Sequence, residues 1–132
     1  MRARTGAVAA ILAGCLALAS PAQAYYARNN FLVQQITPVR MEVFPRGGLN
    51  PIDGWCAVGD YVITMLNLPP ATPIWLVSEP PRHRGESLIF SLSDEGAAST
   101  NGLNTLGEHP LYVTAAAGRA FCPQSLLYWS GL

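Results

Sequence analysis

Cys56 and His109 are the pair of side chains whose types and order fit nucleophilic catalysis. Cys56 falls at the start of the segment that we expect to form the main helix, where free backbone N–H groups and the helix dipole lower the pKa of a thiol. His109 comes just before an apolar run at residues 111–113 and would take the thiol proton as a base. The pair therefore predicts acyl transfer through a thiolate that attacks a carbonyl carbon.

The order of these elements resembles that of the papain-like amidases and peptidases that cleave bacterial cell wall, in which a cysteine opens a helix and a histidine lies on a following strand. The resemblance covers the order of the elements and the two residues Cys56 and His109. It implies that Cys56 is the nucleophile, that His109 is its base and that peptidoglycan is the substrate.

A disulfide is the competing interpretation of Cys56. After removal of the leader described below, Cys56 and Cys122 are the remaining cysteines, and two cysteines in a small exported domain predict one bridge. The bridge closes most of the domain into one loop, which the chain-entropy model rates at about 4 kcal/mol of stability. Because an oxidised Cys56 has no thiolate, the disulfide and the amidase exclude each other, and we favour the disulfide.

Arg82, His83 and Arg84 form a short basic cluster between two apolar runs. We interpret it as a solvated hairpin tip; the alternative is an anion-binding site, whose positive charge increases when the histidine is protonated. His83 and His109 together would also suit acid–base cleavage of a phosphodiester, as in small secreted ribonucleases, although only their number supports this. The spacing of potential ligands matches no metal site or phosphate loop, so we predict no metal and no cofactor.

The first 24 residues have the pattern of a secretory signal peptide, with a basic start, an apolar run at residues 7–19 and small residues at the end. The apolar run is shorter than the roughly 20 residues that span a bilayer as a helix. We therefore predict cleavage after Ala24, no transmembrane span, and a periplasmic or secreted protein. The alternative is a lipoprotein anchored through Cys15, because residues 12–15 resemble a lipobox.

The composition limits the classes of partner. The chain has 132 residues and a formal net charge of zero, with arginine as its only strongly basic residue type. No basic face for nucleic acid is implied. Residues 25–132 have the length of one domain, and we expect them to fold as a single unit.

One helix, from about residue 54 to residue 67, is the clearest element. Asp53 is placed to cap its free N–H groups, and two prolines at residues 69–70 block its continuation. The apolar stripe that should pack on a sheet consists of Trp55, Val58, Val62, Met65 and Leu66. Gly59 costs about 1 kcal/mol relative to alanine inside a helix, which predicts that another backbone, that of the element carrying Cys122, comes close there.

Short β-rich runs complete an α+β fold, in which a small, mostly antiparallel sheet of three or four strands is covered by the main helix. The runs are residues 39–44, 73–78, 87–92 and 111–113, of which the second and third form a hairpin. Thr114 caps a short C-terminal helix that ends at Cys122 and that the disulfide ties to the domain. Residues 25–35 have no firm period, and residues 93–110 form a long segment that is either mobile or functional.

Together these features predict a small exported, disulfide-stabilised domain that acts as a noncatalytic interaction or binding module of the cell envelope. Its partner would be an envelope or extracellular protein. The partner-binding residues would be those of the apolar tail, Leu126, Leu127, Tyr128 and Trp129, if that tail is exposed. The alternative function is the cysteine amidase that acts on peptidoglycan through Cys56 and His109.

Overall fold

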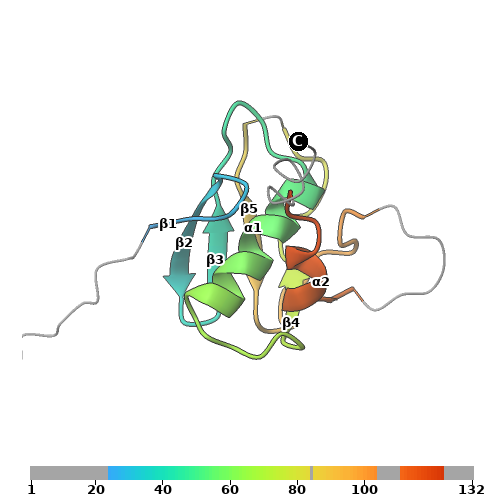
Figure 1. The fold of residues 1–132 in the computed structure, drawn as a ribbon. Helices are drawn as coiled ribbons and strands as arrows, with labels where there is room; N and C mark the ends of the chain where they lie inside the picture. Colours follow the sequence, from blue (N-terminus) through green and yellow to red (C-terminus); the bar gives the residue numbers. More distant parts are fainter. Residues whose placement is uncertain (1–23, 84, 104–110, 124–132) are drawn as a thin grey trace, which may run out of the picture.

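A computed structural model describes residues 24–83, 85–103 and 111–123. The elements are β1 (Tyr25–Tyr26), β2 (Leu32–Thr37), β3 (Arg40–Val43), α1 (Pro51–Thr64), β4 (Pro73–Leu76), β5 (Leu88–Ser91), β6 (Val113–Thr114) and α2 (Ala115–Arg119). The strands form one curled antiparallel sheet in the order β1-β2-β3-β5-β4-β6, with α1 lying across it and α2 beside α1 (Figure 1). The α+β class is confirmed, but the sheet has six strands where three or four were predicted.

The additional strands lie toward the edges of the sheet and carry weak sequence signals. β1 is two residues long, too short to show alternation. In β2 the pairing with β3 shifts register between Gln35 and Thr37, so the alternation of apolar and polar residues is interrupted at that bulge. The predicted hairpin is confirmed, because β4 and β5 pair antiparallel with Trp75 opposite Ser91.

The helix α1 begins and ends earlier than predicted. Asn50 rather than Asp53 is the N-cap: its side chain accepts a hydrogen bond from the Asp53 backbone N–H at 2.9 Å, and Pro51 stands where a missing N–H costs nothing. At the other end, Asn67 adopts φ 52° and the Leu68 N–H donates to the Val62 carbonyl at 3.1 Å. Met65 of the predicted stripe consequently lies past the helix and is 38% exposed.

The core lies between α1 and the sheet. Trp55, Val58 and Val62 of the predicted stripe are fully buried. They meet the inward side chains of the strands, which are Val33, Met41, Val43, Ile74, Leu76, Leu88 and Phe90. The Trp55 ring lies 4.8 Å from that of Phe90 in an edge-to-face arrangement, and its Nε1 donates to the Asn101 carbonyl at 2.8 Å. This contact places residues near Asn101 beside the start of α1.

The close approach predicted at Gly59 is confirmed. A Cβ at this position would lie 2.5 Å from the backbone N of Arg119 and 2.6 Å from the carbonyl O of Ala115, both in α2. A Cβ added to Gly118 of α2 would likewise lie only 2.7 Å from the carbonyl oxygen of Trp55 in α1. The two helices therefore touch backbone to backbone, which explains why Gly54–Val62 are buried on every side.

The predicted disulfide joins the same two segments. Cys56 in α1 is bonded to Cys122, which follows α2, across a sequence separation of 66. Thr114 caps α2 as predicted, accepting from the Ala117 N–H at 3.2 Å. A structural disulfide indicates a location outside the cytoplasm. Within the described part of the chain, no helix is both long and apolar enough to cross a membrane.

Candidate functional site

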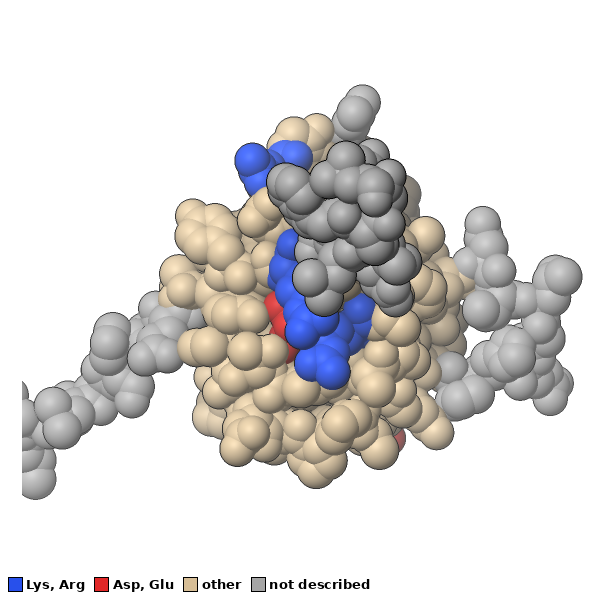
Figure 2. Space-filling view, in the orientation of Figure 1, with Lys and Arg blue, Asp and Glu red and all other residues tan. Residues whose placement is uncertain are grey.

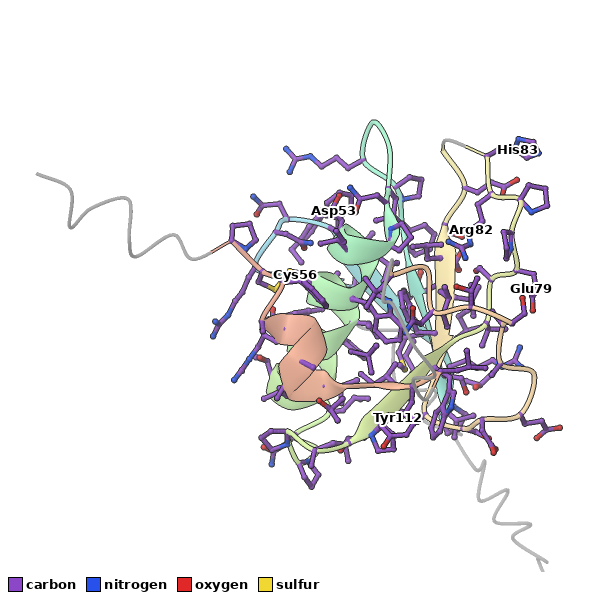
Figure 3. All side chains as sticks on the ribbon, turned by 90° about the vertical axis from the view of Figure 1, so that its right-hand side faces the viewer. Asp53, Cys56, Glu79, Arg82, His83 and Tyr112 are labelled. Atoms are coloured by element: carbon purple, nitrogen blue, oxygen red, sulfur yellow. A yellow bond between two sulfur atoms is a disulfide. The ribbon has the colours of Figure 1, made fainter. Side chains whose placement is uncertain are left out.

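A cleft of about 580 Å³ opens between the start of α1 and the loop that joins β4 to β5. One wall comes from the segment that leads into α1 and the other from the loop and the start of β5; the lining residues are Gly48, Leu49, Asn50, Pro51 and Asp53 on the first wall and Pro80, Arg82, His83, Glu86 and Leu88 on the second. Figure 3 shows Asp53 in the first turn of the helix, with Arg82 and His83 on the loop opposite. The tertiary fold thus brings together two segments that are distant in the sequence.

The helix wall is fixed by the cap of α1. Asn50 accepts the Asp53 N–H through its side chain and the Gly54 N–H through its backbone carbonyl, at 2.9 and 3.1 Å. Pro51 has no N–H to offer. The first turn of α1 is therefore largely satisfied by its own cap, and the Asp53 carboxylate adds negative charge where an anion would otherwise be attracted.

The loop wall is braced from two directions. Arg82 donates from Nε to the Ser78 carbonyl at 3.0 Å, and the His83 backbone N–H donates to Glu86 Oε2 at 3.2 Å. Glu79 accepts from both the backbone N–H and the hydroxyl of Ser99, at 2.6 and 2.9 Å. These contacts hold the loop against the segment that follows β5, so the charged groups of this wall have a defined position.

The charges of the cleft are mixed in sign. Arg82 and His83 contribute positive charge or the capacity for it, and Asp53 and Glu86 contribute negative charge. Among the described residues the one ion pair is Arg28 with Asp60, outside the cleft, so none of these four groups forms an ion pair with another described residue. A ligand that carries both a cationic and an anionic group is complementary to such a surface.

The predicted site residues are separated by the fold. Arg82 and His83 line the cleft, whereas Cys56 is 1% exposed and bonded to Cys122, so it carries no thiolate in this state. The other predicted residues lie outside the described residues, and the predictions about them stay predictions: residues 1–23 with Cys15, Arg84, His109, Leu126, Leu127, Tyr128 and Trp129.

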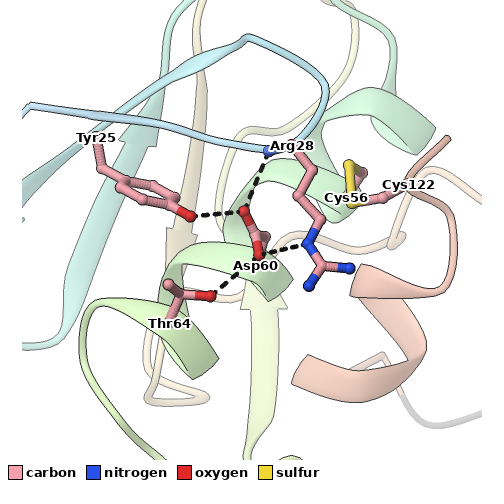
Figure 4. Close-up of polar contacts among 6 residues, drawn as sticks. All are labelled: Tyr25, Arg28, Cys56, Asp60, Thr64 and Cys122. Carbon is pink, nitrogen blue, oxygen red and sulfur yellow. Dashed lines mark hydrogen bonds and ion pairs between the residues drawn. A yellow bond between two sulfur atoms is a disulfide. The ribbon is translucent and has the colours of Figure 1, made fainter. Parts of the chain in front are cut away.

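A second polar cluster surrounds Asp60, a fully buried carboxylate one helical turn after Cys56 (Figure 4). It accepts from the Tyr25 hydroxyl at 2.8 Å, the Arg28 backbone N–H at 3.1 Å and the Thr64 hydroxyl at 3.1 Å, and Arg28 Nε lies 3.4 Å away. Burial, followed by the hydrogen bond to Asp60, raises the pKa of Tyr25 above 10.0. The cluster fastens the N-terminal strand to α1 and has a structural role.

Basic side chains gather over the two helices on the face shown in Figure 2, with an acidic side chain beside them. Arg28 reaches the Asp60 carboxylate here, and Arg119 ends α2. In the described ranges, no three His, Cys, Asp or Glu side chains come close enough together to hold a metal ion.

Comparison of the chain with protein-family models, curated proteins and solved structures finds no match.

Asp53 and Glu86 are cleft residues that the sequence pattern does not single out, because Asp53 stands where a helix cap is expected and Glu86 lies in the polar segment between two apolar runs. The signal that could have corrected the first assignment is the pair Asn50-Pro51, an N-cap residue followed by proline at the first helical position. No local signal identifies Glu86, since its position opposite Asp53 results from the packing of the loop against the start of α1.

Proposed function

We propose that this protein is a noncatalytic binding module that works outside the cytoplasm and takes a peptide segment of an envelope protein into the cleft between α1 and the β4–β5 loop. The observation that carries the proposal is the pair of walls that bring charges of opposite sign to one cleft, with Asp53 on the helix wall and Arg82 and His83 on the loop wall. The cleft volume of about 580 Å³ falls in the range of small binding sites, roughly 300–1,000 Å³.

A peptide suits this cleft better than a simple anion or cation. An anion would meet Arg82 and His83 but also Glu86, which lies on the same wall. A peptide with a basic and an acidic side chain close together can satisfy both signs, while Leu49 and the prolines of the walls contact its apolar atoms. Charge complementarity of this kind contributes mainly specificity and a faster association rate.

Selection of peptides from a displayed random library tests the proposal. The immobilised, oxidised protein should enrich peptides that carry a basic and an acidic residue within a few positions of each other. Changing Glu86→Gln should weaken the selected peptides about tenfold, the effect of losing one charge-assisted contact. Glu95→Gln is the matched control, because Glu95 is also an exposed acid but lies in the turn after β5, away from the cleft.

The proposal would be wrong if the enriched peptides showed no preference for paired charges, or if Glu86→Gln and Glu95→Gln affected them equally. Melting curves of both variants should match that of the parent, because both side chains are exposed at the surface. If Glu86→Gln loses stability as well as binding, Glu86→Asp distinguishes the two causes. This variant keeps the charge and should retain binding.

A further inference from the structure

A second cleft, of about 650 Å³, lies at the β1–β2 edge of the sheet and differs in character from the first. Its floor follows from the strand register: Tyr26 pairs with Leu32, and the Phe44 N–H donates to the Leu32 carbonyl at 2.9 Å. Val33 and Val43 point toward α1 and are fully buried, so their neighbours Leu32 and Phe44 point to the opposite face. Two aromatic rings therefore flank an aliphatic side chain in one row on the face that α1 does not cover.

The exposure of this row is unusual for aromatic residues in a sheet. Tyr26 is 68% exposed, the largest value among the exposed large hydrophobic residues of the described chain. Its strand neighbour Tyr25 has the opposite orientation and donates its hydroxyl to Asp60 on the α1 side. The same dipeptide thus contributes one ring to the fold and presents the other to solvent.

Polar groups stand at the rim of this row. Asn30 is held at φ 64° in the β1–β2 turn, where its N–H donates to the Ala27 carbonyl at 2.8 Å, and its side chain is exposed. Arg46, also exposed, follows Phe44 and Pro45 and makes no ion pair with any described residue. The acid on the same face of β3, Glu42, accepts from the Ser87 hydroxyl at 2.5 Å. Among the described residues that line the cleft there is one cation, Arg46, and no acid.

We infer that this second cleft binds an acidic saccharide. The faces of Tyr26 and Phe44 carry the negative side of the ring quadrupole, which attracts the slightly positive C–H groups on the flat side of a sugar ring. The Arg46 guanidinium matches the two oxygens of a sugar carboxylate, and the Asn30 amide offers a donor and an acceptor to hydroxyl groups. Two rings in one row, with a cation and an amide at its rim, are complementary to a hydroxylated ring that bears a carboxylate.

The site is independent of the peptide cleft, because the two clefts share no lining residue. Its test is calorimetric titration of the oxidised protein with hexagalacturonate, with neutral maltohexaose and the acidic peptide hexaglutamate as comparison probes. We expect hexagalacturonate to bind and the other two probes to bind at least about tenfold more weakly, since each lacks either the charge or the rings.

Four variants locate the binding. Arg46→Gln and Tyr26→Ala should each weaken hexagalacturonate about tenfold, the first by removing the carboxylate partner and the second by removing the stacking surface. Arg82→Gln is the matched control, because it removes an arginine of the other cleft and should leave the affinity for the saccharide unchanged. Tyr26→Phe keeps the ring and should bind like the parent, which separates stacking from a general disturbance of β1.

Four outcomes would overturn the inference. Equal affinity for maltohexaose would show that the Arg46 charge is irrelevant, and equal affinity for hexaglutamate would show that charge alone is recognised. If hexagalacturonate gave no heat of binding, or if Arg82→Gln and Arg46→Gln had equal effects, the second cleft would not be a saccharide site. None of these results bears on the peptide cleft, whose own test uses Glu86→Gln.

Discussion

Gly59 is the position at which a single methyl group should have a large effect. In an otherwise unhindered helix, alanine in place of glycine stabilises by about 1 kcal/mol. Here an added Cβ would lie 2.5 Å from Arg119 N and 2.6 Å from Ala115 O, whereas ordinary contact begins at 3.4 Å. The atoms in the way belong to the backbone of α2, so the helix as a whole must move back by roughly 1 Å.

That movement is opposed by the Cys56–Cys122 bridge, which ties the segment after α2 to α1. Overpacking a well-packed site typically costs about 1–3 kcal/mol, and we take the upper end because neither neighbour is a flexible side chain. After subtraction of the helix-propensity gain, Gly59→Ala should lower the free energy of unfolding by about 2 kcal/mol. At about 4–8 °C per kcal/mol for a domain of this size, the melting temperature should fall by roughly 8–16 °C.

Urea unfolding followed by tryptophan fluorescence measures this loss, since Trp55 is fully buried in the core. Gly54→Ala is the matched control: it lies in the same helix and has the same propensity gain, but its Cβ would meet the ends of the Leu88 and Phe90 side chains, at 2.8 and 2.9 Å. Those ends can shift, so the control should lose less stability than Gly59→Ala. A Gly59→Ala protein as stable as the parent would refute the argument that the helices touch backbone to backbone.

Three further predictions concern the buried polar cluster, the bridge and alkaline pH. Asp60→Asn should lower the free energy of unfolding by about 3 kcal/mol: with its amide oxygen toward Tyr25 and the Arg28 N–H, its NH2 group faces the Arg28 Nε donor, and the carboxylate charge is lost; a loss below about 1 kcal/mol in urea would contradict a buried hydrogen-bonded carboxylate. Replacing Cys56 and Cys122 together by serine should lower the free energy of unfolding by about 4 kcal/mol, and reduction of the parent should lower its melting temperature as the double variant does. An unchanged melting temperature after reduction would show that the bridge does not form. The pKa of Tyr25 is raised above its ordinary value of 10.0 by burial and by Asp60, so its contribution to stability is present below about pH 10 and is lost as the pH rises through the raised value. Tyr25→Phe should therefore show a flatter decline of stability above pH 10, and an unchanged slope would count against this assignment.

The local elements of this fold were largely predictable from the sequence. The strand at Met41 and Val43 alternates clearly, the β4–β5 hairpin is bounded by turn residues, and Thr114 stands where a helix cap is needed. Even the approach of α2 to Gly59 could be predicted, because a glycine inside a helix is costly unless another backbone comes close. In each case the cause acts over a few residues and leaves its mark on residue type and spacing.

What the sequence could not determine depends on contacts between distant segments. The edge strand β1 is recognisable only through its partner Leu32, and the burial of Asp60 only through Tyr25 and Arg28. The two clefts arise in the same way: Asp53 faces Arg82, and Tyr26 joins Phe44 in one row, because packing and register bring separate segments together. By itself the sequence determined the helix, the central strands and the pairing of Cys56 with Cys122, since these follow from short-range periodicity and from the presence of two cysteines after residue 24. The tertiary structure alone decided which charged and aromatic side chains share a surface, because that depends on long-range packing that no local pattern records.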